Sequence, residues 1–451
     1  LWQSIGKWFS SGGSTSPIRR ARPRLEVLEE RTVPAVFTVS TALDSGAGSL
    51  RAAITAANAN TGLDTINFAI SQGGYAATIE LESALPAITD QVFIDGFTQG
   101  GQGAAQKPWV ELDGENTATG NGLTIAAGGV TVRGLAISRF KQTNIDTNDG
   151  NGILIQATAS TATNSIYACY IGAGLDGTAE DRGNGGAGIR VERSFNTLGS
   201  TTAGLGNVIS KNGKDGVTIV SGANNNVLVG NIIGLDATGD IVRGNGGSGV
   251  AVHGNSTQIG LQNDGGNVIS GNGQHGVYVN GSNATLNNNL IGLDKAGDAA
   301  KGNVRSGVYL DSGASSTMVG GTGDDATRNV ISGNGSYGID VRSRNANFIR
   351  GNYVGTNEDG DDHVYNQFDG IGASNASNLE IGGATYASFG NVIIAREGKV
   401  GVNLGIGTTN CLVKSNWICK YEDETIPEGV GVWKADAGVG NTFNSSDNKH
   451  N

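Results

Sequence analysis

The sequence predicts an all-β fold: a right-handed parallel β-helix with three short strands per coil and a helical cap at the N-terminal end. Three observations carry this prediction. First, the 451 residues include 75 glycines and 45 asparagines but only 6 prolines, a composition that disfavours helix bundles and collagen. Second, apolar strand-like segments recur about every 30 residues. Third, asparagines recur in a constant phase with these segments, as expected of stacked coils.

The repeats begin at about residue 109. Strands of the type Gly-Val or Gly-Ile start at residues 188, 216, 249, 276, 307, 338, 370 and 401. Between them lies a series of asparagines at 207, 231, 267, 289, 329, 352, 391 and 416. Equivalent residues of successive coils stack about 4.8 Å apart, so their amides can hydrogen-bond along the stack. We therefore expect ten or eleven coils, a rod of roughly 50 Å, and a structural role for nearly all the asparagines.

Four regions follow from composition and pattern. Residues 1–34 form a basic leader, with six Lys and Arg against three Glu. Residues 35–108 contain the cap and the first strands, 109–445 the repeats, and 446–451 a polar tail. The cap is a predicted helix at Ser49–Ala59, with Ser49 as N-cap and Leu50, Ala53, Ile54 and Ala57 on one apolar face. We expect strands at Val36–Thr41, Thr65–Ile70, Thr78–Leu81 and Gln91–Ile94.

Charge, hydropathy and cysteine content exclude several classes of protein. The net charge of −11 argues against a nucleic-acid partner. No apolar run approaches the length of a transmembrane span. The three cysteines are too few for a disulfide framework. We predict that they are small buried residues. A Cys411–Cys419 pair is the alternative.

Two sets of segments carry resemblances to known proteins. Residues Arg22–Ala35 resemble the N-terminal signature of secreted planctomycetal surface proteins, which implies export. The remaining segments resemble bacterial extracellular β-helix repeat proteins and lie at Ser45–Asn58, Ile94–Gly96, Val132–Leu135, Ile233–Gly239 and Gly266–Gly273. This second resemblance implies the pectin-lyase-like fold and an extracellular or cell-surface location. It leaves the chemistry open, because that group includes lyases, hydrolases, epimerases and adhesins.

The Gly-Val/Ile strand indexes one lateral face. With the glycine as position zero, positions +1 and +3 point inward, and we expect −1, +2 and +4 to face solvent. Aromatic and charged residues gather at these outward positions in the coils from 249 to 342. They are His253, His275, Tyr278, Tyr309, Asp311, Tyr337, Asp340 and Arg342. Aromatic rings beside carboxylate and guanidinium groups suit sugars, since rings stack on C–H surface and charged groups hydrogen-bond hydroxyls.

Three functions are compatible with this face. The favoured one is an exported, non-catalytic protein that binds a polysaccharide, a cell-envelope glycan or a surface partner. A second is a polysaccharide lyase or glycoside hydrolase that uses Asp311, Asp340 and Arg342. The third is a structural envelope rod in which the tyrosines stack for stability and Asp311 and Arg342 form a surface ion pair. The enzyme families' Gly-His-Gly and Asn-Thr-Asp motifs are missing from the sequence.

Acidic inserts between the repeats suggest calcium. The pairs Asp236/Asp240 and Asp294/Asp298 recur only every second coil, too far apart to share an ion. The loop with Asp359, Asp361 and Asp362 is the better candidate for Ca²⁺, with turn-forming residues as the alternative. No other cofactor is predicted.

Overall fold

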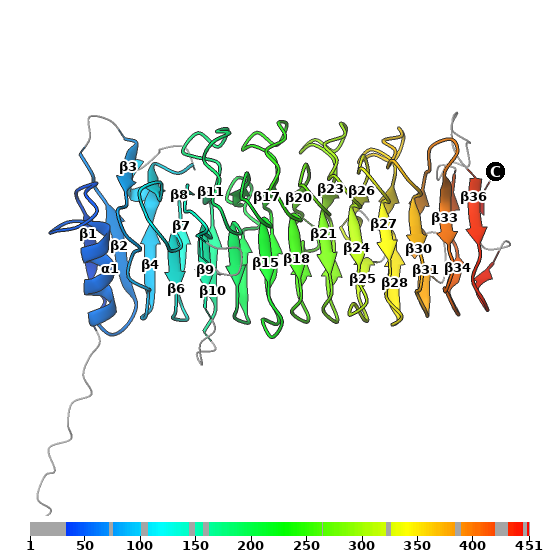
Figure 1. Cartoon of the computed structure of the whole chain (residues 1–451), viewed down its shortest axis with the longest axis horizontal. Helices are drawn as coiled ribbons and strands as arrows, with labels where there is room; N and C mark the ends of the chain where they lie inside the picture. Colours follow the sequence, from blue (N-terminus) through cyan, green and yellow to red (C-terminus); the bar gives the residue numbers. More distant parts are fainter. Residues whose placement is uncertain are drawn as a thin grey trace, which may run out of the picture.

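The computed structural model describes residues 33–71, 75–100, 107–143, 149–156, 162–263, 265–321, 326–383, 389–419, 432–444 and 449–450. These residues form an elongated solenoid of stacked coils (Figure 1). Most of the predicted basic leader and most of the polar tail lie outside the described residues. No helix in the described ranges has the length and apolar character needed to cross a membrane.

Three parallel sheets run along the solenoid, and from β4 to β36 each coil contributes one strand to each sheet. Sheet A has 14 strands: β1 (Val36–Val39), β2 (Asp64–Phe68), β4 (Val92–Asp95), β7 (Thr131–Arg133), β10 (Asn164–Tyr167), β13 (Asn196–Gly199), β16 (Val227–Val229), β19 (Gln258–Ile259), β22 (Thr285–Leu286), β25 (Met318–Gly320), β28 (Asn347–Arg350), β31 (Leu379–Gly382), β34 (Leu412–Lys414) and β37 (Thr442–Phe443).

Sheet B has 13 strands: β3 (Ala77–Glu80), β5 (Val110–Asp113), β8 (Leu135–Ser138), β11 (Tyr170–Ile171), β14 (Val208–Ile209), β17 (Ile232–Ile233), β20 (Val268–Ile269), β23 (Leu290–Ile291), β26 (Val330–Ile331), β29 (Tyr353–Val354), β32 (Val392–Ile393), β35 (Trp417–Ile418) and β38 (Lys449–His450).

Sheet C has 11 strands: β6 (Leu123–Ile125), β9 (Ile153–Ile155), β12 (Ile189–Val191), β15 (Val217–Ile219), β18 (Val250–Val252), β21 (Val277–Val279), β24 (Val308–Leu310), β27 (Ile339–Val341), β30 (Ile371–Ala373), β33 (Val400–Leu404) and β36 (Val432–Asp436).

The all-β parallel solenoid is therefore confirmed, and the rod is longer than predicted. The count of ten or eleven coils began at residue 109, but β1, β2 and β4 already belong to sheet A. The 14 strands of that sheet leave 13 intervals of about 4.8 Å, or roughly 60 Å.

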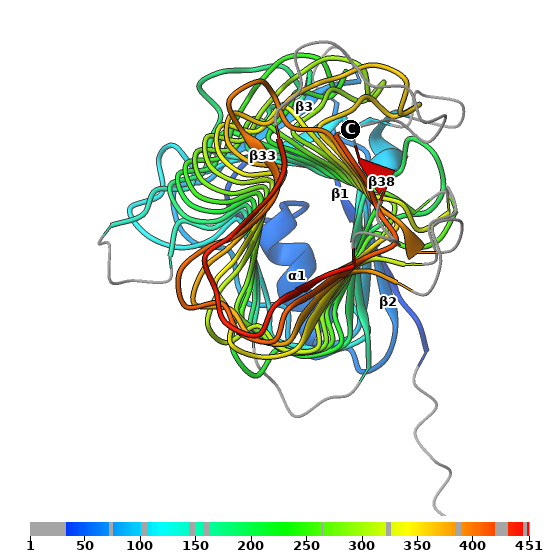
Figure 2. The same cartoon turned by 90° about the vertical axis from the view of Figure 1, so that its right-hand side faces the viewer.

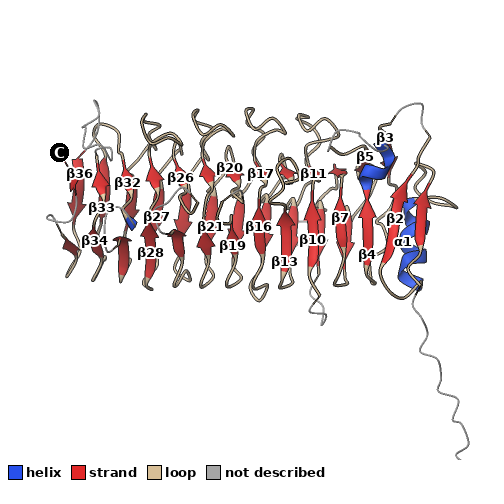
Figure 3. Ribbon diagram, turned by 180° about the vertical axis from the view of Figure 1, so that it is seen from behind, coloured by secondary structure: helices blue, strands red, loops and turns tan. Residues whose placement is uncertain are grey.

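The predicted cap is helix α1 (Leu50–Ala59), which lies across the N-terminal end of the solenoid (Figures 2 and 3). The Ser49 hydroxyl accepts a hydrogen bond from the backbone N–H of Ala52 at 3.2 Å, as expected of an N-cap. The four residues predicted to share a face are buried: Leu50, Ala53, Ile54 and Ala57. The helix therefore covers apolar side chains that the first coil would otherwise expose. A short 3-10 helix, η1 (Gly96–Gly100), follows β4.

The core fills the interior between the three sheets. In β15, Val217 and Ile219 are fully buried, and Val277 and Val279 are fully buried in β21. The inward assignment of positions +1 and +3 is confirmed. The three cysteines are free and buried, which confirms the prediction that they are small buried residues. Residues Cys411 and Cys419 form no disulfide.

Two long series of stacked asparagines bind the coils together. The predicted series forms side-chain hydrogen bonds from Nδ2 to the Oδ1 of the next coil, for example 2.9 Å from Asn231 to Asn267 and 2.9 Å from Asn267 to Asn289. A second series, which we did not predict, runs in the same way through Asn184, Asn212, Asn245, Asn272, Asn303, Asn334 and Asn366. These asparagines are buried, so their structural role is confirmed.

The inserts of the longer coils form turns that stack on one another outside sheet B. The Asp236 carboxylate accepts hydrogen bonds from three backbone N–H groups of its own insert, including that of Gly239 at 3.1 Å. The backbone N–H of Lys295 donates to Gly239 O at 3.0 Å, and that of Glu358 donates to Gly297 O at 3.0 Å. Each of these inserts therefore contacts the next insert, although the two belong to coils that are two apart.

Candidate functional site

The outward side of sheet C carries the column of side chains predicted from position +2. The strand register places Ala251 beside Tyr278, Tyr278 beside Tyr309, Tyr309 beside Asp340, and Asp340 beside Gly372. Successive strands β18, β21, β24, β27 and β30 therefore supply one residue each. The chain repeats the same strand–turn geometry in every coil, so a single sequence position becomes a column along the rod.

A cavity of about 500 Å³ lies on this face. Its lining consists of Gln274, His275, Tyr278, Arg305, Ser306, Tyr309, Asp311, Ser336, Tyr337, Asp340 and Arg342. Seven of the eight predicted ligand-binding residues are in this set. The eighth, His253, lies next to it, with its ring centroid 5.4 Å from that of Tyr278. The structure thus brings all the predicted residues of the face together.

Aromatic rings form one part of the cavity. The rings of Tyr278 and Tyr309 are nearly parallel, with centroids 5.8 Å apart and an interplanar angle of 10°. The imidazole of His275 lies 4.5 Å from the Tyr309 ring centroid. Both tyrosines are only partly buried. Together they form a stacked aromatic pair that is partly exposed to solvent.

The charged residues do not pair as expected. Arg342 donates from Nε to Asp340 Oδ1 at 2.7 Å and from Nη2 to Asp340 Oδ2 at 3.2 Å, and it also contacts the Ser374 hydroxyl. Asp311 instead accepts a hydrogen bond from the Tyr278 hydroxyl at 2.5 Å. The predicted Asp311–Arg342 ion pair is therefore wrong. Residues two apart on a strand share a face, so Asp340 reaches Arg342 without crossing to another coil.

The exposure expected of position −1 is wrong in four of six coils, because only Asp215 and Tyr337 are partly exposed. His275 is 7% exposed, Ser306 1% and Asp369 7%. These residues lie in the bend before the strand, where their side chains fold against the neighbouring coil. Asp369, for example, accepts the backbone N–H of Val400 at 2.9 Å. The bend breaks the strict alternation of the strand, so the in–out pattern cannot be extended through it.

Position −2 also reaches the cavity, and the sequence reasoning missed it. Gln274, Arg305 and Ser336 all occupy this position and all line the cavity. A signal was present in the sequence. The turn before the strand repeats as Asn-Gly-x-x-Gly in several coils, and position −2 is one of its two variable residues. A residue that varies while the rest of the turn motif stays constant is not required for the fold, so it is free to serve another role.

Burial sets the ionisation of the cavity. The pKa of His275 is lowered from 6.5 to about 4 by burial and, to a smaller extent, by the nearby charge of Arg305. Burial and the Asp311 carboxylate raise the pKa of Tyr278 and of Tyr309 above 10. Burial also raises the pKa of Asp340, which Arg342 opposes. At neutral pH the cavity therefore presents a neutral imidazole and two protonated phenols.

The loop predicted as a calcium site forms a turn. The Asn357 side chain accepts the backbone N–H groups of Asp361 and Asp362, each at 3.1 Å, and its Nδ2 donates to Asp361 Oδ1 at 2.9 Å. Within the described residues, no group of three or more His, Cys, Asp or Glu side chains is arranged to hold a metal ion. We propose no calcium site at Asp359, Asp361 and Asp362.

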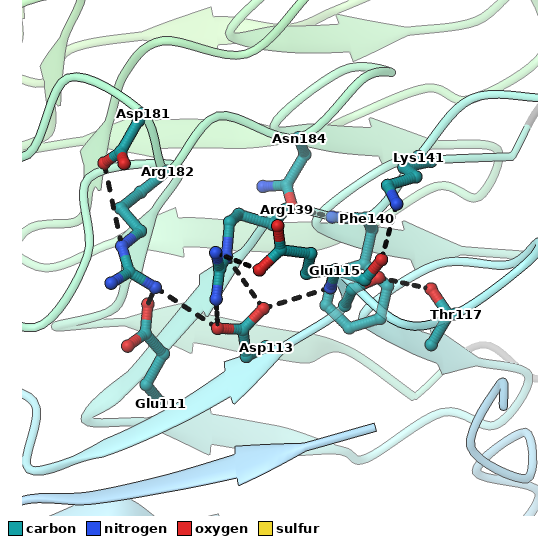
Figure 4. A network of polar contacts seen from close by, with 11 residues as sticks. Glu111, Asp113, Glu115, Thr117, Arg139, Phe140, Lys141, Asp181, Arg182 and Asn184 are labelled. Atoms are coloured by element: carbon teal, nitrogen blue, oxygen red, sulfur yellow. Dashed lines mark hydrogen bonds and ion pairs between the residues drawn. The ribbon is translucent and has the colours of Figure 1, made fainter. Parts of the chain in front are cut away.

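A second polar network, also unpredicted, lies outside sheet B near the N-terminal end (Figure 4). Asp113 of β5 accepts from Arg139 Nε at 2.9 Å and from Arg182 Nη1 at 3.2 Å, and Arg182 lies 3.7 Å from Glu111. Glu111 is 4% exposed and Asp113 2%, and burial raises the pKa of Glu111. Arg182 belongs to the first insert, so the network fastens that loop to the sheet.

A larger cavity, of about 890 Å³, lies outside sheet B farther along the rod. Its lining includes Val268, Leu290 and Val330 from three strands and Lys295 and Glu358 from two inserts. The cation of Arg328 is 3.9 Å from the ring centroid of Tyr353 and covers it. Tyr353 is only 7% exposed, whereas Tyr278 and Tyr309 are partly exposed, so the sheet C face remains the candidate site.

The fold and the site together define a parallel β-solenoid with an aromatic and charged lateral face. No protein-family model and no curated protein sequence matches the chain. Several solved structures share the architecture, the following three among them. Two are A-modules of mannuronan C-5 epimerases from Azotobacter vinelandii. The AlgE6 module is 15% identical and has a TM-score of 0.47, with 92% of this chain and 98% of the module covered.

The AlgE4 module is 15% identical with a TM-score of 0.46, and 92% of this chain and 99% of the module are covered. The third structure is a family PL6 alginate lyase, AlyGC. It is 14% identical with a TM-score of 0.44, and 92% of this chain but 51% of the lyase is covered. At these levels the similarity concerns the fold alone.

Proposed function

We propose that this chain is a non-catalytic glycan-binding protein, and that the cavity on sheet C holds sugar rings. The observation that carries the proposal is the partly exposed, nearly parallel pair of Tyr278 and Tyr309 rings in a cavity lined by charged groups. Aromatic rings stack on the C–H faces of pyranoses. Asp311, Arg305 and the Asp340–Arg342 pair supply acceptors and donors for hydroxyls. An exported, extracellular or cell-surface location fits this function and is part of the proposal.

A polysaccharide lyase or glycoside hydrolase is the second candidate, because Asp340 is a cavity carboxyl whose pKa is raised by burial. Two contacts weaken that case. Asp340 is held at two points by Arg342, and Asp311 is engaged by the Tyr278 hydroxyl. A general acid or base has to be free to exchange a proton with substrate. Binding without turnover is therefore the better-supported function.

Affinity electrophoresis tests the proposal. The purified chain is run through native gels that contain alginate, polygalacturonate, hydroxyethylcellulose or galactomannan. We expect retardation in at least one gel, and at least about tenfold weaker binding in the double variant Tyr278→Ala, Tyr309→Ala, because partly buried aromatic residues dominate binding energies. Phe195→Ala serves as the control, since Phe195 is 47% exposed and lies on a distant coil.

The outcomes separate the three functions. Retardation that the double variant loses and Phe195→Ala keeps supports glycan binding. New reducing ends or unsaturated-uronate absorbance after incubation would show an enzyme and overturn the non-catalytic proposal. The absence of retardation in every gel would contradict glycan binding and leave the structural rod.

A further inference from the structure

The residues at position −2 form a column that continues beyond the cavity. Backbone hydrogen bonds join its members from coil to coil. Arg305 N donates to Gln274 O at 2.9 Å, Ser336 N to Arg305 O at 3.1 Å, and Phe368 N to Ser336 O at 3.0 Å. The first three line the cavity. Phe368 therefore extends the same wall by one coil.

The ring of Phe368 is exposed yet contacts two neighbouring side chains. It is 46% exposed. Its centroid lies 5.6 Å from that of Tyr337, at an interplanar angle of 40°, and the Lys399 ammonium lies over the ring, 4.7 Å from its centroid. Contacts of this kind fix a ring without covering it. A fixed and exposed ring is a surface on which a ligand can stack.

A glycine creates the space for this second aromatic pair. Gly372 occupies position +2 on β30, where the preceding coils carry Tyr309 and Asp340. A Cβ atom at Gly372 would lie 2.5 Å from Cε1 of Tyr337. The missing side chain thus lets the Tyr337 ring lie over β30 and meet Phe368.

We infer that Tyr337 and Phe368 form a second sugar-stacking subsite, and that the ligand is a linear polysaccharide lying along the solenoid axis. The inference rests on the proposed function. The Asp340–Arg342 pair separates this subsite from the Tyr278–Tyr309 pair and supplies hydrogen bonds between the two. From His253 beside β18 to Phe368 beside β30 there are four strand spacings, or about 19 Å.

The length of this track sets the length of the ligand. A pyranose unit in a linear chain advances by about as much as one strand spacing. A chain that contacts every subsite therefore has about four or five sugar residues. Shorter oligosaccharides can occupy the Tyr278–Tyr309 end but cannot reach Phe368 at the same time.

Isothermal titration calorimetry with oligosaccharides of defined length tests the inference. The probes are alginate oligomers of two to eight residues, with cello-oligosaccharides of the same lengths as a neutral series. For the wild type we expect affinity to rise with length and level off at about four or five residues. For Phe368→Ala we expect roughly 3- to 10-fold weaker binding of the longer oligomers and unchanged binding of the disaccharide.

The controls keep this inference distinct from the proposed function. Phe195→Ala removes a phenylalanine of nearly equal exposure and should bind all lengths as the wild type does. Equal affinities of Phe368→Ala and wild type at every length would overturn the second subsite. If Tyr278→Ala, Tyr309→Ala also lost binding in that case, the proposed function would stand without it. A wild type that binds no probe in either series and no polysaccharide in the gels would overturn both.

Discussion

At the scale of single residues, burial rather than side-chain type decides how the sheet C face behaves. His275 and His253 both contribute rings to the face. Only His275 is buried, at 7% exposure. An imidazole in that position is costly to protonate, because the charged form loses its hydration. The cavity thus contains an ionisable group that stays neutral over most of the pH range.

The stability of the chain should reveal this suppressed protonation. The pKa of His275 falls from 6.5 to about 4 on folding. The unfolded chain therefore binds a proton near pH 6.5 that the folded chain binds only near pH 4. The free energy of unfolding must fall as the pH drops through this window, by about 1.4 kcal/mol per pH unit, or roughly 3 kcal/mol in all.

Urea unfolding of the wild type and His275→Gln at pH 7, 6, 5 and 4 measures this effect. Both chains share every other titrating group, including Asp340, whose pKa is raised by burial. The stability of the wild type relative to the variant should therefore decrease by roughly 3 kcal/mol between pH 7 and pH 4. Parallel curves would show that His275 titrates normally in the folded chain.

The residues of the site were predictable where the strand repeat was regular. Tyr278, Tyr309 and Asp340 lie at position +2 of ordinary strands, so alternation alone places them. Arg305 and Phe368 lie in the turn, whose backbone direction the alternation does not describe. The Asp340–Arg342 pair forms because the Tyr278 hydroxyl donates to Asp311, which leaves Asp340 as the partner of Arg342. The spacing of residues in the sequence does not show which of two neighbouring carboxylates each donor contacts.

At the scale of elements, the inserts are loops that cover one sheet. Their positions were visible in the sequence as extra residues in alternate coils. Their packing was not, because the contacts join residues about 60 positions apart, such as Lys295 and Gly239. Leu293 and Val364 of two inserts pack in a second apolar cluster outside sheet B. The first insert uses charge instead, through Arg182.

Removing the charge of Arg182 should loosen the first insert. In Arg182→Met, Glu111 loses its nearby cation and Asp113 keeps only Arg139, while both carboxylates stay buried. We expect the free energy of unfolding at pH 7 to fall by about 1–3 kcal/mol. Thermal and urea denaturation measure this change.

Arg243→Met provides the matched comparison on the neighbouring insert. Its ion-pair partner, Glu180, has a 71% exposed side chain, and the remaining contacts of Arg243 are hydrogen bonds to Thr178 O and Val242 O. Because no buried carboxylate loses its partner, this substitution should cost only about 1 kcal/mol. The cost of Arg182→Met should also shrink at acidic pH, because Glu111 has a raised pKa and becomes neutral early. Equal costs for the two variants would mean that the network does not anchor the insert.

At the scale of the whole molecule, the period and phase of the repeats predicted the architecture almost completely. Each coil contacts mainly its two neighbours, so a repeat in sequence becomes a repeat in space. The number of coils was underestimated because β1, β2 and β4 lack the Asn and Gly-Val/Ile signals of the later coils. The cap was predicted correctly because a single amphipathic helix ahead of the strands can bury its apolar face only against the open end of the solenoid.

A solenoid with nearest-neighbour contacts should lose structure locally when its cap fails. In Ile54→Asp, a side chain that is 1% exposed becomes a buried charge between α1 and the first coil. We expect the buried charge to destabilise this end of the chain by at least about 3 kcal/mol, which is more than the packing of one short helix can offset. Hydrogen exchange measured by mass spectrometry should show lost protection in α1, β1, β2 and β4 and unchanged protection in β21 and β24.

The substitution Thr55→Asp places the same charge on the exposed side of the same helix and should leave the exchange pattern unchanged. Loss of protection along the entire chain in Ile54→Asp would show instead that the solenoid unfolds as one cooperative unit. The glycan-binding face provides an independent readout, because it lies several coils from the cap. If coupling is confined to neighbours, Ile54→Asp keeps its retardation in the affinity gels while its first coils exchange freely.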